Sequence, residues 1–239
     1  MTEGRQELAP GFWVVDGECV SFYSVPYSTR MVVVRLSGGG LWVWSPIALT
    51  AELAAWIDRL GAPAHLVGPN PIHHLFLAEW KERWPEAKIW GPQSLVDKRA
   101  DLPFDGVLDD RPPAEWGGDF KQYHFTNSRL LDELVFLHLP TKSVIFADLS
   151  ENFSRAFVKR EWAWWQRPIA RLWKIVEPFG YAPLEIRLTF RHRERARAML
   201  ADMLAHDPQR VIMAHGEIAK ENGAAYMRKA FAWLGLIRG

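Results

Sequence analysis

The order of secondary-structure elements limits the folds that this chain can adopt. Its first 45 residues are rich in β-branched and aromatic residues and are interrupted by turn residues, a pattern that predicts strands. Four short strands are expected there: Phe12–Val15, Val20–Tyr23, Met31–Leu36 and Leu41–Trp44. An opening made of strands alone is not typical of a simple doubly wound sheet, in which strands and helices alternate from the start.

Helices and strands alternate only after this opening segment. Thr50 is a candidate N-cap for a helix that ends at Leu60, before Gly61. The other expected helices are 73–84, 153–176, 191–206 and 220–234, and Pro168 should break or kink the second of these. The other expected strands are 64–67, 88–90, 120–125, 134–138, 144–147 and 210–213. Residues 92–118 are rich in Pro, Gly and Asp and predict an extended surface excursion. This order favours a layered α/β or α+β fold.

Composition and charge argue against several classes of function. The 239 residues suit one large domain, 1–239, and the share of apolar residues, 49%, is typical of a globular chain. Lys and Arg number 29 and Asp and Glu number 28, which gives no reason to expect a nucleic-acid partner. The single cysteine, Cys19, forms neither an internal disulfide nor a thiolate cluster. No apolar run approaches the roughly 18 residues of a membrane span, and Met1–Pro10 lacks an apolar signal core, so we expect a cytoplasmic protein without a membrane partner.

Thirteen tryptophans are an unusual load for this chain. Most of them gather in three segments, 42–44, 80–90 and 162–173. Because aromatic side chains bury large areas, packing in the core and between layers is the simplest interpretation. A subunit interface, as in a homodimer, and an apolar groove for a small-molecule substrate are the alternatives for residues 162–173.

Potential metal ligands follow three of the expected strands. His73 and His74 come after a buried strand and a Pro-Asn-Pro loop, and Asp148 and His215 each come after a later strand. Ligand sites of α/β folds lie at the carboxyl ends of strands, and imidazole is the commonest metal ligand among side chains. Histidines are also often structural, and Asp148 is a candidate helix cap, so both a metal site and a purely structural role are consistent with these positions.

A hairpin argument separates two further candidates, Glu133 and His138. If the two strands on either side of residues 139–142 pair as a hairpin, His138 lies at the turn and Glu133 lies opposite Asp148. His138 is then about 17 Å from Asp148, at about 3.4 Å per residue. The register therefore predicts a turn histidine at 138, and a metal ligand or general base at Glu133 or its neighbour Asp132.

Several of these motifs resemble the DUF4336 family. They are Gly68-Pro69-Asn70-Pro71-Ile72-His73-His74, Leu134-Val-Phe-Leu-His138 and Ile145-Phe-Ala-Asp148-Leu149. The likeness extends from about Phe12 to His215. DUF4336 proteins look like divergent members of the metallo-β-lactamase-fold superfamily. The resemblance implies an α/β fold, a four-layer αββα sandwich of two mixed sheets with helices on the outer faces, and a site along one edge of the sheets.

The wider superfamily carries the signature His-x-His-x-Asp-His after a strand, and this chain departs from it. When the last histidine of the signature is aligned with His74, the first two histidines fall on Pro69 and Pro71, and the aspartate falls on His73. Proline side chains have no donor atoms. The resemblance therefore implies that the first of the two metal positions of the superfamily is lost here.

The resemblance implies that the second metal position is kept. The late aspartate of the superfamily matches Asp148 and its last histidine matches His215, whereas its middle histidine has no match. The implied ligand set for one divalent ion is His73, His74, Asp148 and His215. Such donors suit zinc, and iron or manganese as well. Four protein ligands make a closed structural site, whereas a supporting role for Asp148 leaves three histidines and an open position for water.

Three functions of different kinds are compatible with these residues. The first is a metal-dependent hydrolase of a small ester, lactone or thioester, in which Asp148 or Glu133 accepts the proton of water and Asn70 donates to the oxyanion. The second is a degenerate domain that binds a small ligand or a protein partner without catalysis and without a metal. The third is redox chemistry at the same metal. Metal content and turnover distinguish among them.

Overall fold

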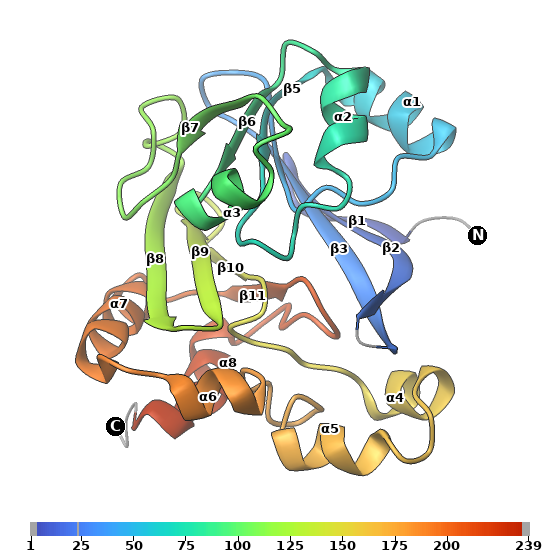
Figure 1. The fold of residues 1–239 in the computed structure, drawn as a ribbon. Coiled ribbons are helices and arrows are strands. Elements are labelled where there is room, and N and C mark those ends of the chain that lie inside the picture. Colours follow the sequence, from blue (N-terminus) through green and yellow to red (C-terminus); the bar gives the residue numbers. More distant parts are fainter. Residues whose placement is uncertain (1–3, 23, 236–239) are drawn as a thin grey trace.

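The larger of the two sheets holds the first seven strands in chain order. The structure, a computed structural model, describes residues 4–22 and 24–235 (Figure 1). The strands are β1 (Gly4–Ala9), β2 (Phe12–Phe22), β3 (Val25–Arg35), β4 (Leu41–Trp44), β5 (Pro63–Val67), β6 (Lys88–Gly91) and β7 (Phe104–Val107). Neighbours from β1 to β4 are antiparallel and neighbours from β4 to β7 are parallel. This sheet is therefore mixed.

The smaller sheet has the strand order β11-β10-β9-β8 and is also mixed. Its strands are β8 (Phe120–Ser128), β9 (Leu131–His138), β10 (Ser143–Phe146) and β11 (Arg210–Met213). β10 pairs in parallel with β11 and antiparallel with β9. His138 lies opposite Ser143 and Leu137 lies opposite Val144, so the predicted hairpin register is confirmed. This register brings the start of β9 to the end of β10.

Alternate residues of β3 face different layers of the molecule. Val32 and Val34 lie in a buried cluster between the two sheets, whereas Met31 and Val33 lie in a second cluster on the outer face of the larger sheet. The second cluster includes residues of the helices α1 (Ala51–Leu60), α2 (Leu77–Arg83) and α3 (Gln93–Lys98). A third cluster joins the outer face of the smaller sheet to α6 (Leu184–Thr189), α7 (Arg193–Ala205) and α8 (Gly223–Ala230). The predicted four-layer αββα sandwich is confirmed (Figure 1).

Several of the tryptophans pack inside these layers, as the simplest interpretation of the sequence expected. Trp42 and Trp44 are fully buried between the sheets, where the ring of Trp42 lies 5.0 Å from that of Phe136. Trp80 belongs to α2 and is fully buried in the cluster on the outer face of the larger sheet. Trp164 and Trp165 differ, because both are exposed. The tryptophans of the first two predicted segments, 42–44 and 80–90, are therefore all buried.

The helix predicted from residue 73 begins only at Leu77, as α2, so that prediction was wrong at its start. Residues 73–76 form turns instead. The side-chain oxygen of Asn70 accepts hydrogen bonds from the backbone N–H groups of Ile72, at 2.8 Å, and His73, at 3.1 Å. Because these bonds hold the chain in a turn, His73 lies in a loop rather than in the first turn of a helix.

Two longer segments also differ from the predictions. Residues 92–118 contain α3 and β7 rather than only an extended excursion. Residues 153–176 form two short helices, α4 (Arg155–Glu161) and α5 (Arg167–Trp173), rather than one. Pro168 lies in the first turn of α5, where its missing N–H removes no helical hydrogen bond, so this proline begins a helix instead of bending one. Among the described residues, no helix is long and apolar enough to cross a membrane.

The N-terminal strands are longer and more numerous than predicted. β1 was not predicted, and β2 joins the two short strands 12–15 and 20–23 into one strand with a register shift between Gly17 and Val20. Tyr23 of the predicted second strand lies outside the described residues, as do residues 1–3 and 236–239 of the predicted domain 1–239.

Candidate metal centre

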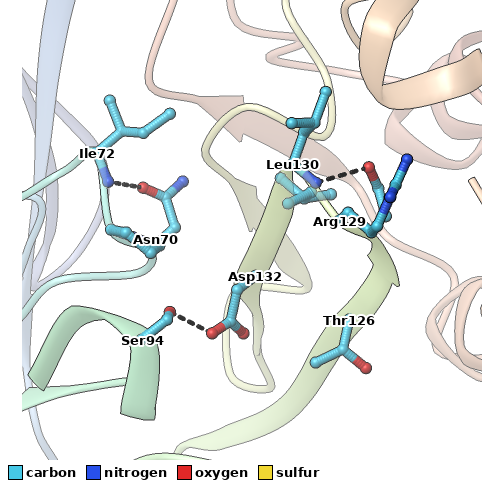
Figure 2. Close-up of a pocket in the computed structure, with 10 residues that line it drawn as sticks. Asn70, Ile72, Ser94, Thr126, Arg129, Leu130 and Asp132 are labelled. Atoms are coloured by element: carbon cyan, nitrogen blue, oxygen red, sulfur yellow. Dashed lines mark hydrogen bonds between the residues drawn. The ribbon is translucent and has the colours of Figure 1, made fainter. Parts of the chain in front are cut away.

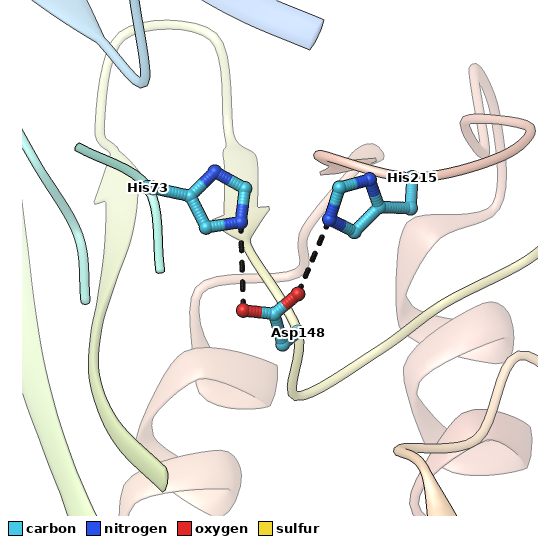
Figure 3. Close-up of side chains that lie close together, drawn as sticks. All are labelled: His73, Asp148 and His215. Carbon is cyan, nitrogen blue, oxygen red and sulfur yellow. Dashed lines mark ion pairs between the residues drawn. The ribbon is translucent and has the colours of Figure 1, made fainter. Parts of the chain in front are cut away.

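Three side chains from distant parts of the sequence meet at one edge of the two sheets. His73 lies in the loop after β5, Asp148 two residues after β10, and His215 two residues after β11. One donor atom from each of the three lies within 4.8 Å of the other two. Both imidazoles point toward the carboxylate of Asp148 (Figure 3): the Nε2 of His73 is 3.4 Å from Oδ2, and the Nε2 of His215 is 3.2 Å from Oδ1.

His215 is held in one tautomer by the backbone of β3. Its Nδ1 lies 2.6 Å from the carbonyl oxygen of Ser28, and since a carbonyl only accepts, Nδ1 carries the proton. In the neutral ring Nε2 then keeps its lone pair and faces Asp148. The residue after it, Gly216, has a φ of 83°, and a Cβ there would lie 2.2 Å from the carbonyl oxygen of Asn152. Only glycine lets this turn approach so closely.

His73 is oriented in a similar way by β4 and the residue that follows it. The hydroxyl of Ser45 lies 2.8 Å from Nδ1 of His73, and the ring of Trp44 stacks on the imidazole at a centroid distance of 6.1 Å. The Nε2 atom is buried and forms no hydrogen bond, because its 3.4 Å contact with Asp148 does not have hydrogen-bond geometry. A buried imidazole nitrogen without a hydrogen-bond partner is available as a metal ligand.

Asp148 is an ionised carboxylate in a buried position. Burial tends to raise the pKa of Asp148, but the two neighbouring imidazoles outweigh burial and hold that pKa below its ordinary value. Asn70 donates a hydrogen bond of 2.7 Å from Nδ2 to the Oδ2 of Asp148. Since the other end of the Asn70 amide holds the backbone of His73, one side chain links two members of the cluster.

The cluster fits a divalent cation on the chemistry of its donors. In the neutral form of His215, a nitrogen lone pair would lie 3.2 Å from a carboxylate oxygen of Asp148, so two acceptors would face each other. Such a contact is stable when a positive centre lies between the two atoms, either a metal ion or a proton. Two imidazole nitrogens and one carboxylate are donors that zinc, iron and manganese accept.

The sequence of this chain matches a defined family. Residues 11–154, more than half of the chain, match the family described as DUF4336, a domain of unknown function. The chain belongs to the DUF4336 family. No curated protein matches the sequence of this DUF4336 protein.

Solved structures place this DUF4336 protein in the metallo-β-lactamase fold. A metallo-β-lactamase from Hirschia baltica superposes with a TM-score of 0.63 at 13% identity and covers 98% of this chain and 98% of its own. FIM-1 from Pseudomonas aeruginosa in its mono-zinc form has a TM-score of 0.64 at 9% identity, over 98% and 96% of the two chains. The metal-soaked flavodiiron core Flv1 from Synechocystis has a TM-score of 0.64 at 13% identity, over 98% and 61%. At these identities the likeness shows the fold alone.

His74, the fourth predicted ligand of this DUF4336 protein, does not join the cluster. Its Nδ1 lies 3.1 Å from Nη1 of Arg99, which also donates to the carbonyl oxygen of His74. Burial, together with the charges of Lys98 and Arg99, lowers the pKa of His74 to about 4. The structure therefore brings together three of the four residues predicted as ligands, and Asp148 is one of these three.

Glu133 lies beside Asp148, as the register predicted, but its carboxylate faces the backbone. The two oxygens accept hydrogen bonds from the N–H groups of Ala147 and Asp148, both at 2.8 Å, and Leu149, at 3.0 Å. Burial and the charge of Asp148 raise the pKa of Glu133 to about 8, although the three hydrogen bonds act to lower it. Glu133 thus fixes the turn that carries Asp148. His138 lies at the hairpin turn and contacts Thr141 at 2.8 Å, as predicted.

Sequence reasoning missed three residues that support the cluster: Ser28, Ser45 and Arg30. Arg30 is buried, and its Nη1 donates to the carbonyl oxygens of Met213 and Gly216, both at 2.7 Å, on either side of His215. Ser45 directly follows β4, which pairs in parallel with β5. Its position at the carboxyl end of a strand could have identified it as a site residue from the sequence. Ser28 and Arg30 carried none, because they lie inside a strand far from the other residues of the site.

A pocket of about 480 Å³ adjoins the loop that carries His73 (Figure 2). It lies between that loop and the turn from β8 to β9, and Asn70 belongs both to its lining and to the contacts of Asp148. Asp132 is engaged inside the pocket, because it accepts hydrogen bonds from Ser94 and His124. Arg129 lines the pocket and its side chain forms no ion pair or hydrogen bond with any described residue. The pocket therefore offers one cation, Arg129, and one engaged carboxylate, Asp132, among otherwise uncharged residues.

Proposed function

We propose that this protein is a metal-dependent hydrolase with a single divalent ion, held by His73, Asp148 and His215. The observation that carries the proposal is the convergence of three donor atoms within 4.8 Å, one of them a buried Nε2 without a hydrogen-bond partner. Three protein ligands leave a position free for water or substrate, which a catalytic metal site requires.

A single ion is favoured over two because of the loop between β5 and α2. Pro69 and Pro71 stand where the resemblance places the first two histidines of the superfamily, and neither side chain has a donor atom. One of the fold neighbours, FIM-1, is described in a mono-zinc form, so a single ion is compatible with this fold in that protein.

The ion, when bound, supplies Lewis acidity, which polarises a carbonyl group and lowers the pKa of water to about 7. Asp148 is the acceptor that we assign to the proton of water, since its carboxylate lies within the cluster and Asn70 donates only to its Oδ2. Glu133 is less suitable, because both of its oxygens already accept backbone hydrogen bonds. Asn70 positions Asp148 and His73 instead of donating to an oxyanion, since its amide is engaged at both ends.

The substrate that we propose is a small ester, lactone or thioester bound in the adjoining pocket. A volume of about 480 Å³ lies within the range of small-molecule sites, about 300–1,000 Å³. Arg129 gives the pocket an unpaired cation, which favours a substrate with an anionic group away from the bond that is cleaved.

Metal content measured by elemental mass spectrometry tests this proposal. We expect about one ion per chain in the wild type and little in His73→Ala or His215→Ala, because each variant removes one of three ligands. His74→Ala is the matched control: it removes a neighbouring imidazole that faces Arg99, so metal content should stay at the wild-type level. The element found also separates zinc from iron or manganese, and a screen of esters, lactones and thioesters follows on the loaded protein.

Three results would overturn the proposal. If the wild type takes up no metal after reconstitution, the domain that binds a ligand or partner without catalysis becomes the better interpretation. If His74→Ala loses the metal and His73→Ala keeps it, the ligand set derived from the structure is incorrect. Hydrolysis that survives in metal-free His73→Ala protein would show that the reaction does not depend on this centre.

A further inference from the structure

The segment 155–174, which we call the α4–α5 hairpin, exposes a compact group of large apolar side chains. Trp164 is 79% exposed, Trp165 55%, Ile169 41% and Leu172 71%. Trp165, Ile169 and Leu172 follow the spacing i, i+4, i+7, so they lie along one side of α5 and the turn before it. Figure 1 shows α4 and α5 together at one end of the molecule, with α4 next to the turn between β2 and β3.

This exposed face belongs to a well-anchored element. The inner side of the hairpin forms a buried cluster that contains Trp162 and Ala170 together with Phe153. The indole N–H of Trp162 donates to the carbonyl oxygen of Pro26 at 2.9 Å, and the Gln166 amide donates to Ser24 at 3.2 Å. The hairpin is therefore fixed to β3 and the turn before it. Because its inner side is buried, its exposed apolar side chains cannot turn into the core.

The hairpin is also strongly cationic, although the chain as a whole is nearly neutral. Residues 155–174 contain six Lys and Arg residues and one acidic residue, Glu161. The rest of the chain contains 23 Lys and Arg residues and 27 Asp and Glu residues. Glu161 pairs with Arg160, its neighbour in sequence. Lys159, Arg171 and Lys174 are exposed on the same hairpin as the apolar residues.

We propose that the α4–α5 hairpin docks this protein onto an anionic lipid surface. Tryptophan rings favour the headgroup region of a bilayer, and Ile and Leu side chains enter the acyl boundary below it. Lys and Arg around such an apolar face contact lipid phosphates. The combination of apolar and cationic residues on one rigid element fits this surface. No helix in residues 4–22 and 24–235 is long and apolar enough to span a membrane, and docking on a surface requires none.

Two other occupants, a second copy of this chain and a nucleic acid, fit this face less well. In a two-fold homodimer the same patch meets itself, so six cations and one anion would face an identical set, which is unfavourable. A nucleic acid would satisfy the cations and stack on the tryptophans, but it offers no apolar volume for Ile169 and Leu172. A lipid surface complements both properties.

Flotation with vesicles tests the proposal. We expect wild-type protein to float with phosphatidylcholine vesicles that contain phosphatidylglycerol, to bind pure phosphatidylcholine weakly, and to lose binding at high salt. The charge variant, Lys159→Gln with Arg171→Gln, should bind about 30-fold more weakly, since each cation near an anionic surface contributes about a factor of five. The apolar variant, Trp164→Ser with Leu172→Ser, should bind at least about tenfold more weakly.

Matched controls separate docking from general charge and from folding. Arg228→Gln with Lys229→Gln removes two exposed cations from α8 and should bind vesicles as the wild type does. Far-ultraviolet circular dichroism checks that every variant is folded. Metal-free protein should bind equally well, so this result is independent of the proposed hydrolase.

Wild-type protein that stays in solution with anionic vesicles at low salt overturns the proposal. So does equal binding by the charge variant and the α8 control. A dimer in sedimentation analysis that the apolar variant converts to a monomer, without vesicle binding by the wild type, would assign this face to a second copy instead. Retention of a single-stranded oligonucleotide without vesicle binding would assign it to nucleic acid.

Discussion

Asn70 is the residue whose replacement tests the architecture of the metal centre most directly. Its side chain forms three hydrogen bonds: one of 2.7 Å to Asp148 and two from the backbone N–H groups of Ile72 and His73, at 2.8 Å and 3.1 Å. The residue is only 1% exposed, so water does not replace these bonds in the native protein. Asn70→Ala removes all three at once.

The expected loss of stability follows from these contacts. A hydrogen bond between neutral groups contributes about 1 kcal/mol and one to a charged group about 1.5–3 kcal/mol, so the three together contribute about 4 kcal/mol. Ile72 is half-exposed, and its N–H gains water in the variant, which reduces the expected loss to about 3 kcal/mol. Residues that orient metal ligands typically change metal affinity by about 10–100-fold, and we expect a loss in that range.

Two measurements check this prediction. Urea unfolding, followed by tryptophan fluorescence, gives the free energy of unfolding of wild type and variant without metal. Competition with a chromophoric chelator gives the metal affinity. Gln93→Ala is a suitable control, because Gln93 forms one exposed hydrogen bond within α3. If Asn70→Ala unfolds within about 0.5 kcal/mol of the wild type and binds metal equally well, the contacts of Asn70 do not hold the site and the reasoning fails.

Three further predictions concern His138, Ser45 and Arg129. Burial lowers the pKa of His138 to about 4, so between about pH 6.5 and pH 4 this histidine binds a proton in the unfolded chain but not in the folded protein. The free energy of unfolding should therefore fall by up to about 3 kcal/mol as the pH drops through that window. His138→Phe should weaken this pH dependence, measured by urea unfolding at pH 7 and pH 4. Ser45→Ala should reduce metal affinity about tenfold or more in the chelator assay, because His73 loses the partner of its Nδ1; unchanged affinity would contradict this role. Arg129→Gln should raise KM for an anionic ester and leave KM for a neutral ester unchanged; equal effects on both would argue against an anionic substrate.

The parts of the site that the sequence predicted correctly depend on local pairing. The hairpin between β9 and β10 has a short turn, so its register follows from counting residues, and the register placed Glu133 beside Asp148 and His138 at the turn. Strand ends were equally readable, because Asp148 and His215 each follow a short apolar run. In both cases a few neighbouring residues determine the position of the side chain.

The parts that the sequence left undecided depend on contacts across the fold. The sequence does not show which of His73 and His74 faces the cluster, because that choice follows from a turn held by the side chain of Asn70. Ser28 contacts His215 across 187 residues of sequence, and no periodicity predicts such a pair. The exposed face of α5 was visible as a group of tryptophans, but periodicity alone did not separate the buried Trp162 from the exposed Trp164.

The contacts of the prolines in the loop after β5 fit the single ion that we propose. The backbone carbonyl of Pro69 accepts a hydrogen bond of 2.8 Å from the N–H of Leu134, which ties the loop to β9 of the other sheet. Asn70 then fixes the turn and reaches Asp148. At the positions where the resemblance places two metal-binding histidines, this chain has prolines, and hydrogen bonds within the protein hold the loop instead. In the single-ion site that we propose, the loop therefore needs no first metal for its shape.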